Sequence, residues 1–205
     1  AQHGVTVRYI QADMSKPAEC RVLIERAGAC DILVNNAGIQ HVAPIPEFPA
    51  EKWDAIIAIN LSSAFHTTAA ALPVVRKAGW GRVVNIASAH GLTASPYKSA
   101  YVAAKHGIVG LTKVTALETA GEGITCNAIC PGWVLTPLVQ QQIDERARQD
   151  GDEQRARHDL LAEKQPSLDF VTPAQLGALA LFLCSEAGDQ VRGAAWNMDG
   201  GWVAQ

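Results

Sequence analysis

The sequence contains no run of basic residues and little excess charge of either sign. Its 205 residues include 17 Lys and Arg and 20 Asp and Glu, giving a formal net charge of −3. A protein that follows a nucleic acid needs several cations to neutralise successive phosphates, so we expect no nucleic-acid partner. No apolar run approaches the roughly 20 residues of a membrane span, and no signal peptide opens the chain. We therefore expect a cytoplasmic protein without a membrane partner.

Cysteines are few and carry no recognisable pairing pattern. The five are odd in number and the chain is not small, which argues against a disulfide framework. Cys126 and Cys130 lie four residues apart in an apolar run, with no histidine-rich motif nearby. They are expected to be buried thiols rather than zinc ligands, and no metal site is predicted.

Apolar strand-like segments alternate along the chain with helical segments. This rhythm predicts an α/β fold: a parallel sheet, covered by helices on both faces in three layers, with ligands at the carboxyl ends of its strands. No linker divides residues 1–205, so a single domain is expected. The expected strands are Val5–Ile10, Asp31–Val34, Arg82–Ile86, Ile124–Ile129 and Ala194–Met198. The expected helices are Ser15–Ala27, Pro49–Leu72, Tyr101–Leu117, Pro137–Glu163 and Pro173–Leu183.

Tyr101 and Lys105 stand four residues apart in one expected helix and therefore share a face. A free tyrosine, with a pKa of about 10, is a poor base at neutral pH, but a nearby cation favours its phenolate. Such a pair can move a proton to or from an alcohol. Ser88, at the end of an expected strand, could bind the same oxygen. Asn60 lies inside an apolar helix, where a buried amide needs partners.

Together with Asn35-Asn36-Ala37-Gly38 and Pro131-Gly132, these residues resemble a short-chain dehydrogenase/reductase, from about Val5 to the C-terminus. The resemblance implies a Rossmann-like, doubly wound sheet and four catalytic residues. Tyr101 would be the general acid/base and Lys105 would lower its pKa and bind the nicotinamide ribose. Ser88 would orient the reacting oxygen and Asn60 would hold a relay water. The implied NAD-binding residues are Asp13, Asn36, Ala37, Gly38, Tyr101, Lys105, Pro131, Gly132, Val134 and Thr136.

Polar side chains from separate segments converge where this family builds its substrate pocket. Gln40, His90, Lys98 and Gln142 suit a small carboxylate, and Trp133 and Trp202 complete the set. The combination is similar to family members that act on hydroxybutyrate, which implies oxidation of (R)-3-hydroxybutyrate to acetoacetate with NAD⁺. His41 and Tyr97 are not expected to take part. Residues 137–168 are charged and interrupt the strand-helix rhythm, so they are interpreted as a mobile lid, the alternative being a rigid helix pair.

The glycine-rich turn that holds the cofactor pyrophosphate in this family is missing. Ala1 stands just before what would be the third strand, so about one βαβα unit is absent. We therefore expect a fragment in which Val5–Ile10 has no neighbour and strand Asp31–Val34 has an uncovered edge. Such a chain should bind NAD poorly, and micromolar binding in isothermal titration would contradict this. NAD, rather than NADP, is implied by the resemblance alone.

Two alternatives remain open. One is a related reductase acting on 3-oxoacyl thioesters or other small carbonyls, and the other is a catalytically silent, truncated chain that serves as a binding partner. The helix Tyr101–Leu117 is rich in small residues, and the family pairs the equivalent helices across a two-fold axis, so a homotetramer is expected.

Overall fold

The computed structural model describes residues 4–204, except the side chains of residues 138 and 150. Its sheet contains β1 (Ile32–Asn35), β2 (Gly81–Ile86), β3 (Ile124–Pro131) and β4 (Ala195–Met198). These strands lie side by side in the order β1-β2-β3-β4, and each neighbouring pair is parallel. The expected α/β fold with a parallel sheet is confirmed.

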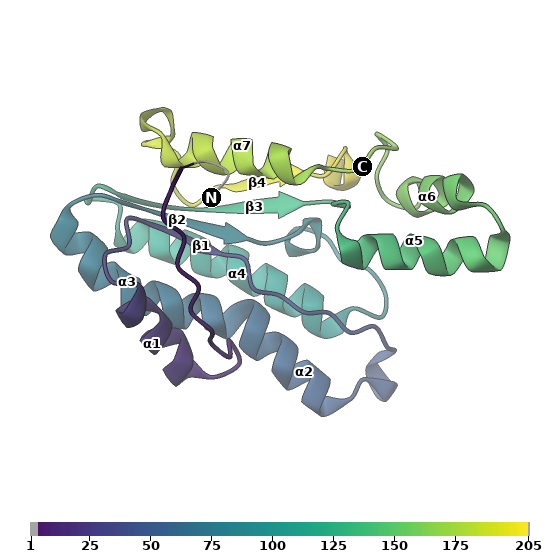
Figure 1. Ribbon diagram of the computed structural model, residues 1–205, viewed down its shortest axis with the longest axis horizontal. Coiled ribbons are helices and arrows are strands. Elements are labelled where there is room, and N and C mark those ends of the chain that lie inside the picture. Colours follow the sequence, from purple (N-terminus) through teal and green to yellow (C-terminus); the bar gives the residue numbers. More distant parts are fainter. Residues whose placement is uncertain (1–3, 205) are drawn as a thin grey trace.

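Helices cover both faces of this sheet (Figure 1). On one face lie α3 (Ser63–Ala78) and α4 (Ser99–Glu118), with α1 (Pro17–Ala27) packed beside α3. On the other face α7 (Pro173–Cys184) contacts β2 and β3. The predicted three-layer arrangement is therefore present.

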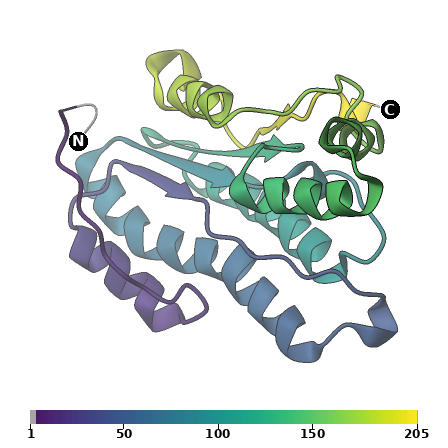
Figure 2. The same cartoon turned by 45° about the vertical axis from the view of Figure 1, so that its right-hand side comes forward.

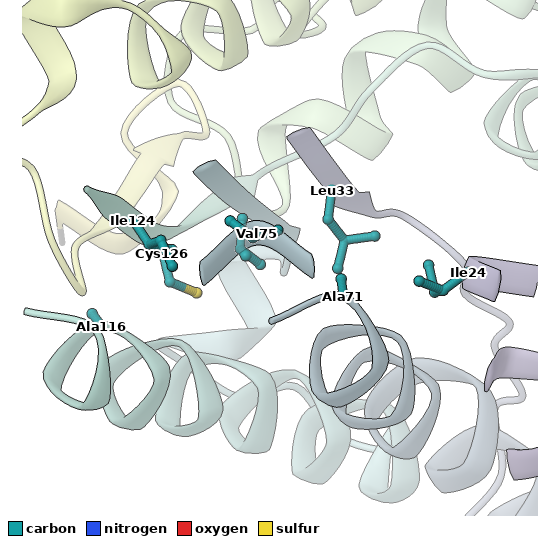
Figure 3. Packing of buried hydrophobic residues seen from close by; sticks show 8 residues of the cluster. Ile24, Leu33, Ala71, Val75, Ala116, Ile124 and Cys126 are labelled. Carbon is teal, nitrogen blue, oxygen red and sulfur yellow. The ribbon is translucent and has the colours of Figure 1, made fainter. Parts of the chain in front are cut away.

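The core between the sheet and the α3–α4 layer is made of small and medium-sized apolar side chains. Figure 3 shows Leu33, Ile124 and Cys126 pointing from the strands toward Ala71 and Ala116 of the helices. Small residues on the helices allow close approach to the sheet, and each fully buried aliphatic side chain contributes roughly 1.5–3 kcal/mol. Cys126 and Cys130 are completely buried in β3, as expected.

The segment Val5–Ile10 does not form the predicted strand. It runs outside the sheet, and the side chains of Val5, Val7 and Tyr9 are 61%, 76% and 88% exposed. A strand forms only when its backbone groups find a hydrogen-bonded neighbour, and none is present for this segment among the described residues. The outer edge of β1 is uncovered in the same part of the structure, and Ile32 and Val34 are about half exposed.

The expected helix Pro49–Leu72 is longer than predicted and is interrupted. It consists of α2 (Ala50–Ile57), a π-helical turn η2 (Ala58–Ser62) and α3, which continues through Pro73. The helix ends at Gly79, whose φ of 75° lies in the left-handed region. The combined run Ala50–Ala78 is apolar and long enough to cross a membrane by composition. Here it packs against α1, α4 and the sheet, as a covering helix of the domain does.

Two further helices stand beyond the carboxyl ends of β2 and β3 (Figure 2). They are α5 (Pro137–Asp150) and α6 (Glu153–Ala162), and the side chains of Thr136 and Asp152 cap their first turns. Apolar residues of this α5–α6 hairpin form a cluster of their own with Phe170. Short helical turns complete the fold: η1 (Ile45–Glu47), η3 (Ala89–Gly91), η4 (Glu186–Gly188) and η5 (Trp202–Ala204).

Candidate active site

A cavity of about 320 Å³ lies at the carboxyl ends of the strands. Its walls come from the turn after β1, the end of β2, α4, the turn after β3, α5 and η5, so it collects residues far apart in the sequence. The predicted site residues that line it are Asn36, Gly38, Gln40, Ser88, His90, Lys98, Tyr101, Lys105, Pro131, Gly132, Trp133, Val134, Thr136, Gln142 and Trp202. Ile39, Ile86, Ala87 and Val139 provide most of the remaining wall.

Ser88 occupies the junction between β2 and η3. Its hydroxyl oxygen accepts a hydrogen bond from the backbone N–H of His90 at 3.2 Å, which caps η3. Because that bond uses the oxygen as an acceptor, the hydroxyl hydrogen stays available to another oxygen. Tyr101 lies beside Ser88, whose hydroxyl acts to lower the pKa of the phenol.

Tyr101 and Lys105 share one face of α4, as their spacing predicts. The Nζ atom of Lys105 lies 5.6 Å from the centroid of the Tyr101 ring and donates a hydrogen bond to the Ile86 carbonyl at 2.7 Å. Burial lowers the pKa of Lys105 to about 8.

The pKa of Tyr101 differs from the sequence-based prediction. Burial raises it above its ordinary value, and the hydrogen bond with Ser88 only opposes this rise. The expected lowering by Lys105 is absent because that ammonium group is itself desolvated and directs its hydrogen bond to Ile86 rather than to the phenol. The tyrosine of this structure is therefore a protonated phenol at neutral pH.

Asn60 lies in the π-helical turn and is 1% exposed. Its side-chain oxygen accepts from the Ile39 N–H, and its side-chain nitrogen donates to the Ile39 carbonyl, both at 2.9 Å. The residue thus fixes the turn after β1, just behind Gly38, and does not line the cavity. With both ends of the amide occupied, the predicted role in holding a relay water stays a prediction.

A network of buried polar side chains supports the strand ends. Asn35 of β1 donates to the Oδ1 atom of Asn85 of β2 at 2.8 Å and accepts from Thr67 of α3 at 2.7 Å. Asn85 in turn donates to Thr112 of α4 at 2.8 Å. Sequence reasoning did not identify this network, although an asparagine inside an otherwise apolar strand is a usable signal that a buried partner exists.

His90 is a buried wall of the cavity, 4% exposed. Its ring meets Tyr101 and Trp202 edge-on, with centroids 5.8 and 5.0 Å apart, and its Nε2 atom lies 3.0 Å from the Ser95 hydroxyl oxygen. Burial, aided by the positive charge of Lys98, lowers the pKa of His90 to about 4. The imidazole is therefore neutral at physiological pH.

Lys98 supplies the positive charge on this side of the cavity. Its Nζ atom lies 5.5 Å from the centroid of the Trp133 ring, and burial lowers its pKa below the ordinary value. Trp133 and Trp202 lie against each other with ring centroids 6.0 Å apart. The two indoles form an apolar wall, and Gln40 and Gln142 add amide groups to the cavity lining.

The turn after β3 depends on a residue that sequence reasoning missed. Gln165 is 1% exposed, and its Oε1 atom accepts from the Trp133 N–H at 2.8 Å. A Cβ atom at Gly132 would lie 2.4 Å from this oxygen and 2.8 Å from the Asp199 backbone, so only glycine fits there. Asp199 accepts from the N–H groups of Gly201 and Val203, which fixes the start of η5 and hence Trp202.

The predicted cofactor residues divide into two groups. Those expected near the reacting end of a nicotinamide line the cavity together with the buried ammonium of Lys105. These cavity-lining residues fit the nicotinamide-ribose half of the cofactor. Ala37 lines a separate, smaller cavity behind the turn. Asp13 lies outside both cavities, and its carboxylate accepts hydrogen bonds from Ser15.

A second, outer cavity of about 920 Å³ adjoins the first, and the two share Gln40, Lys98, Trp133, Gln142 and Trp202. Its rim includes an ion pair between Arg146 of α5 and Glu163, which joins the two ends of the α5–α6 hairpin at 2.7 Å. His41 and Tyr97 border this outer cavity but not the inner one. No group of three or more metal-ligating side chains occurs within the described residues.

The sheet, the Tyr101–Lys105 helix and the cavity at the strand ends define a nicotinamide-dependent oxidoreductase. The family model for short chain dehydrogenases matches residues 1–147, and the chain belongs to this family. The predicted family, and with it the Rossmann-like fold, is confirmed.

Two relatives are similar along nearly the whole chain. A D-beta-hydroxybutyrate dehydrogenase from Cupriavidus necator is 65% identical, with 100% of this chain and 81% of that protein covered. One from Rhizobium meliloti is 54% identical over 98% of this chain and 80% of that protein.

Solved structures agree on the fold. A putative gluconate dehydrogenase from Agrobacterium tumefaciens, 32% identical, superposes with a TM-score of 0.87 over 100% of this chain and 79% of its own. A putative 2-deoxy-d-gluconate 3-dehydrogenase from the same organism, with bound NADP, is 36% identical with a TM-score of 0.83; the match covers 96% of this chain and 76% of its own. The predicted nicotinamide cofactor is supported.

Proposed function

We propose that the protein oxidises (R)-3-hydroxybutyrate to acetoacetate with NAD⁺, and catalyses the reverse reaction. The observation that carries the proposal is the composition of the inner cavity. Lys98, His90 and two glutamine amides line the same space of about 320 Å³ as Ser88 and Tyr101. A four-carbon hydroxy acid presents a carboxylate for the first set of groups and a hydroxyl group for the second.

The carboxylate would be held mainly by Lys98, since His90 is neutral and contributes a hydrogen bond rather than a charge. Gln40 and Gln142 add amide donors, and the Trp133–Trp202 wall provides an apolar surface beside the carbon chain. Desolvation by this wall strengthens the attraction between Lys98 and the carboxylate.

In the oxidation, Tyr101 would first release its phenolic proton to solvent and then, as the phenolate, take the hydroxyl proton of the substrate while the C3–H bond breaks and the C3=O double bond forms. NAD⁺, which Lys105 and the turns containing Gly38 and Gly132 would hold, would supply the hydride acceptor. Ser88 donates a hydrogen bond to the same substrate oxygen, and Lys105 keeps a positive charge next to Tyr101 and binds the ribose hydroxyls. In the reduction, Tyr101 begins as the protonated phenol that its raised pKa favours and gives its proton to the carbonyl oxygen. Asn60 would hold the relay water that exchanges this proton with solvent.

Initial rates of NADH formation with the (R) and (S) enantiomers test the proposal directly. We expect turnover of the (R) form and little of the (S) form, because the carboxylate anchor and Tyr101 fix two of the groups at C3. Ser88→Ala should lower kcat roughly a hundredfold, since one hydrogen bond to the reacting oxygen is lost. Equal rates with both enantiomers would contradict the proposed pocket, and NADP⁺ in place of NAD⁺ tests the cofactor preference.

One alternative substrate class is favoured by a specific observation. The outer cavity of about 920 Å³ opens beside Lys98 and Trp133 and has room for the carrier part of a 3-oxoacyl thioester. Acetoacetate and acetoacetyl thioesters should therefore be compared at equal concentrations. A higher kcat/KM for the thioester would replace the proposed function, and turnover of neither would favour a silent chain that binds or assembles with partners.

The α5–α6 hairpin is proposed to act as the substrate lid, because α5 contributes Val139 and Gln142 to the inner cavity. We also propose a cytoplasmic homotetramer, without nucleic-acid or membrane partners, that serves ketone body metabolism. Its assembly is supported by exposed apolar side chains on α4, Val114 and Leu117, which are 52% and 76% exposed. Sedimentation equilibrium would measure the assembly.

A further inference from the structure

Three segments that build the substrate wall meet at one buried side chain outside the cavity, Gln165. It follows α6, and its backbone N–H donates to the Leu161 carbonyl at 2.7 Å, so it continues the end of the α5–α6 hairpin. Its side chain reaches the turn after β3 through the Trp133 N–H. The Nε2 atom donates to the Asp169 carbonyl, which belongs to the segment leading to α7.

After the α5–α6 hairpin and the turn after β3, the third segment of the substrate wall is the turn after β4. At Gly200, whose φ is 58°, a Cβ atom would lie 2.6 Å from the Cγ atom of Gln165. The backbone N–H of Ser167, two residues after Gln165, donates a hydrogen bond to the Gly200 carbonyl at 3.0 Å. Two glycines, Gly132 and Gly200, are therefore packed directly against the same glutamine. One side chain sets the distance between the turn that carries Trp133 and the turn that leads to Trp202.

We propose that Gln165 is a positioning residue that fixes the two-tryptophan wall and couples it to the α5–α6 hairpin. It does not line either substrate-side cavity. Its effect on catalysis passes through the backbone at Trp133 and through the packing of Gly200, two residues before Trp202. The consequence for the reaction rests on the proposed function, whereas the consequence for the tryptophan pair does not.

Asn127 offers a matched control. It is also a buried amide, 1% exposed, whose two ends join main-chain groups: Nδ2 donates to the Val191 carbonyl at 2.6 Å, and Oδ1 accepts from the Ala194 N–H at 3.0 Å. It lies within β3 and lines neither of these two cavities. Loss of a buried amide should therefore lower the melting temperature in a similar way at Gln165 and Asn127, whereas only the change at Gln165 should disturb the tryptophan wall.

The experiment compares Gln165→Glu with Asn127→Asp in the full chain. Each change replaces an amide donor by a carboxylate oxygen beside a main-chain carbonyl. The first measurement is the near-ultraviolet circular dichroism band of the tryptophan pair, assigned by its loss in Trp133→Phe. We expect Gln165→Glu to lose at least about half of this band and Asn127→Asp to keep it, although both variants melt at a lower temperature.

Steady-state kinetics with (R)-3-hydroxybutyrate provides the second measurement. For Gln165→Glu we expect KM to rise about tenfold while kcat changes by less than about threefold, because the wall binds substrate but moves no proton. Asn127→Asp should leave both constants near those of the wild type. Wild-type protein that does not oxidise hydroxybutyrate would count against the proposed function only, since the dichroism band needs no substrate.

An unchanged band in Gln165→Glu, or equal loss of the band in both variants, would overturn the proposal. If Gln165→Glu does not fold, Gln165→Met is used, since it removes both hydrogen bonds at similar volume. If neither variant folds while Asn127→Asp does, Gln165 is required for folding as a whole, and the proposal also fails.

Discussion

The two sides of the inner cavity are held in place by different means. The catalytic side, with Ser88, Tyr101 and Lys105, is built on the end of a central strand and on a long helix packed against the sheet. The substrate side, with Lys98, Trp133 and Trp202, comes from turns and termini joined by a few polar side chains such as Gln165 and Asp199. The proposed catalytic groups are therefore anchored in the core, while the proposed substrate-binding groups depend on turns joined by a few polar side chains.

The largest effect is expected on the catalytic side. Tyr101→Phe removes the only phenol in the inner cavity of the described structure and should lower kcat by about three orders of magnitude, with KM nearly unchanged. Tyr97→Phe is the control, because Tyr97 lies outside the inner cavity and is 59% exposed. Stopped assays of NADH formation measure both, and an unaffected Tyr101→Phe rate would remove the proposed mechanism.

A large effect on stability should come from the substrate side. The pKa of His90 in the fold, about 4, is lower than the 6.5 of an exposed imidazole, so the unfolded chain binds the proton more tightly. The contribution of His90 to the free energy of unfolding is therefore complete above pH 6.5. It is lost as the pH falls from 6.5 to about 4, by at most about 3 kcal/mol. Urea unfolding of wild type and His90→Gln across that range checks it; parallel pH profiles would contradict it.

A smaller effect distinguishes binding from chemistry. His90→Ala should raise KM for hydroxybutyrate roughly ten- to thirtyfold with a lesser change in kcat, because the imidazole is proposed to contact the carboxylate rather than the reacting oxygen. His158→Ala is a suitable control, since the His158 side chain is 60% exposed on α6. A fall in kcat without a rise in KM would contradict this role and indicate that His90 acts on the reacting groups instead.

The smallest effect concerns Ser95, which lies 3.0 Å from the Nε2 atom of His90. Ser95→Ala frees the His90 ring to change tautomer, so KM should rise about threefold. The pH profile of KM should stay flat near pH 6.5, because the pKa of the buried His90 is about 4. Combined with His90→Ala, the Ser95 change should add nothing, as a double-mutant cycle would show.

The sequence predicted that Ser88, Tyr101 and Lys105 would lie together, as they do in the inner cavity, because the determinants of their positions are local. A four-residue spacing on a helix and a serine after an apolar strand specify Tyr101, Lys105 and Ser88 without knowledge of tertiary contacts. The turn containing Gly132 was also found, but its partner Gln165 was not, because a contact across 33 sequence positions leaves no periodic signal. The charge environment of Tyr101 was predicted incorrectly, since burial cannot be judged from spacing.

The secondary-structure prediction was wrong where strand pairing or packing overrides the local preference of the residues. Val5–Ile10 has the residues of a strand but no neighbour to bond among the described residues. The run Ala58–Ser62 has an ordinary helical sequence, yet it takes a wider π-helical turn while Asn60 bonds both backbone groups of Ile39.

This π-helical turn also bears on how the chain can change length. A π-helical turn closes i→i+5 hydrogen bonds and so holds one residue more than an α-helical turn. Losing one residue from Ala58–Ser62 would therefore leave an ordinary helix that keeps α2 and α3 near their present orientation, but the wide turn from which Asn60 bonds both backbone groups of Ile39 would be lost. A single-residue deletion here should preserve the long helix and loosen the turn after β1.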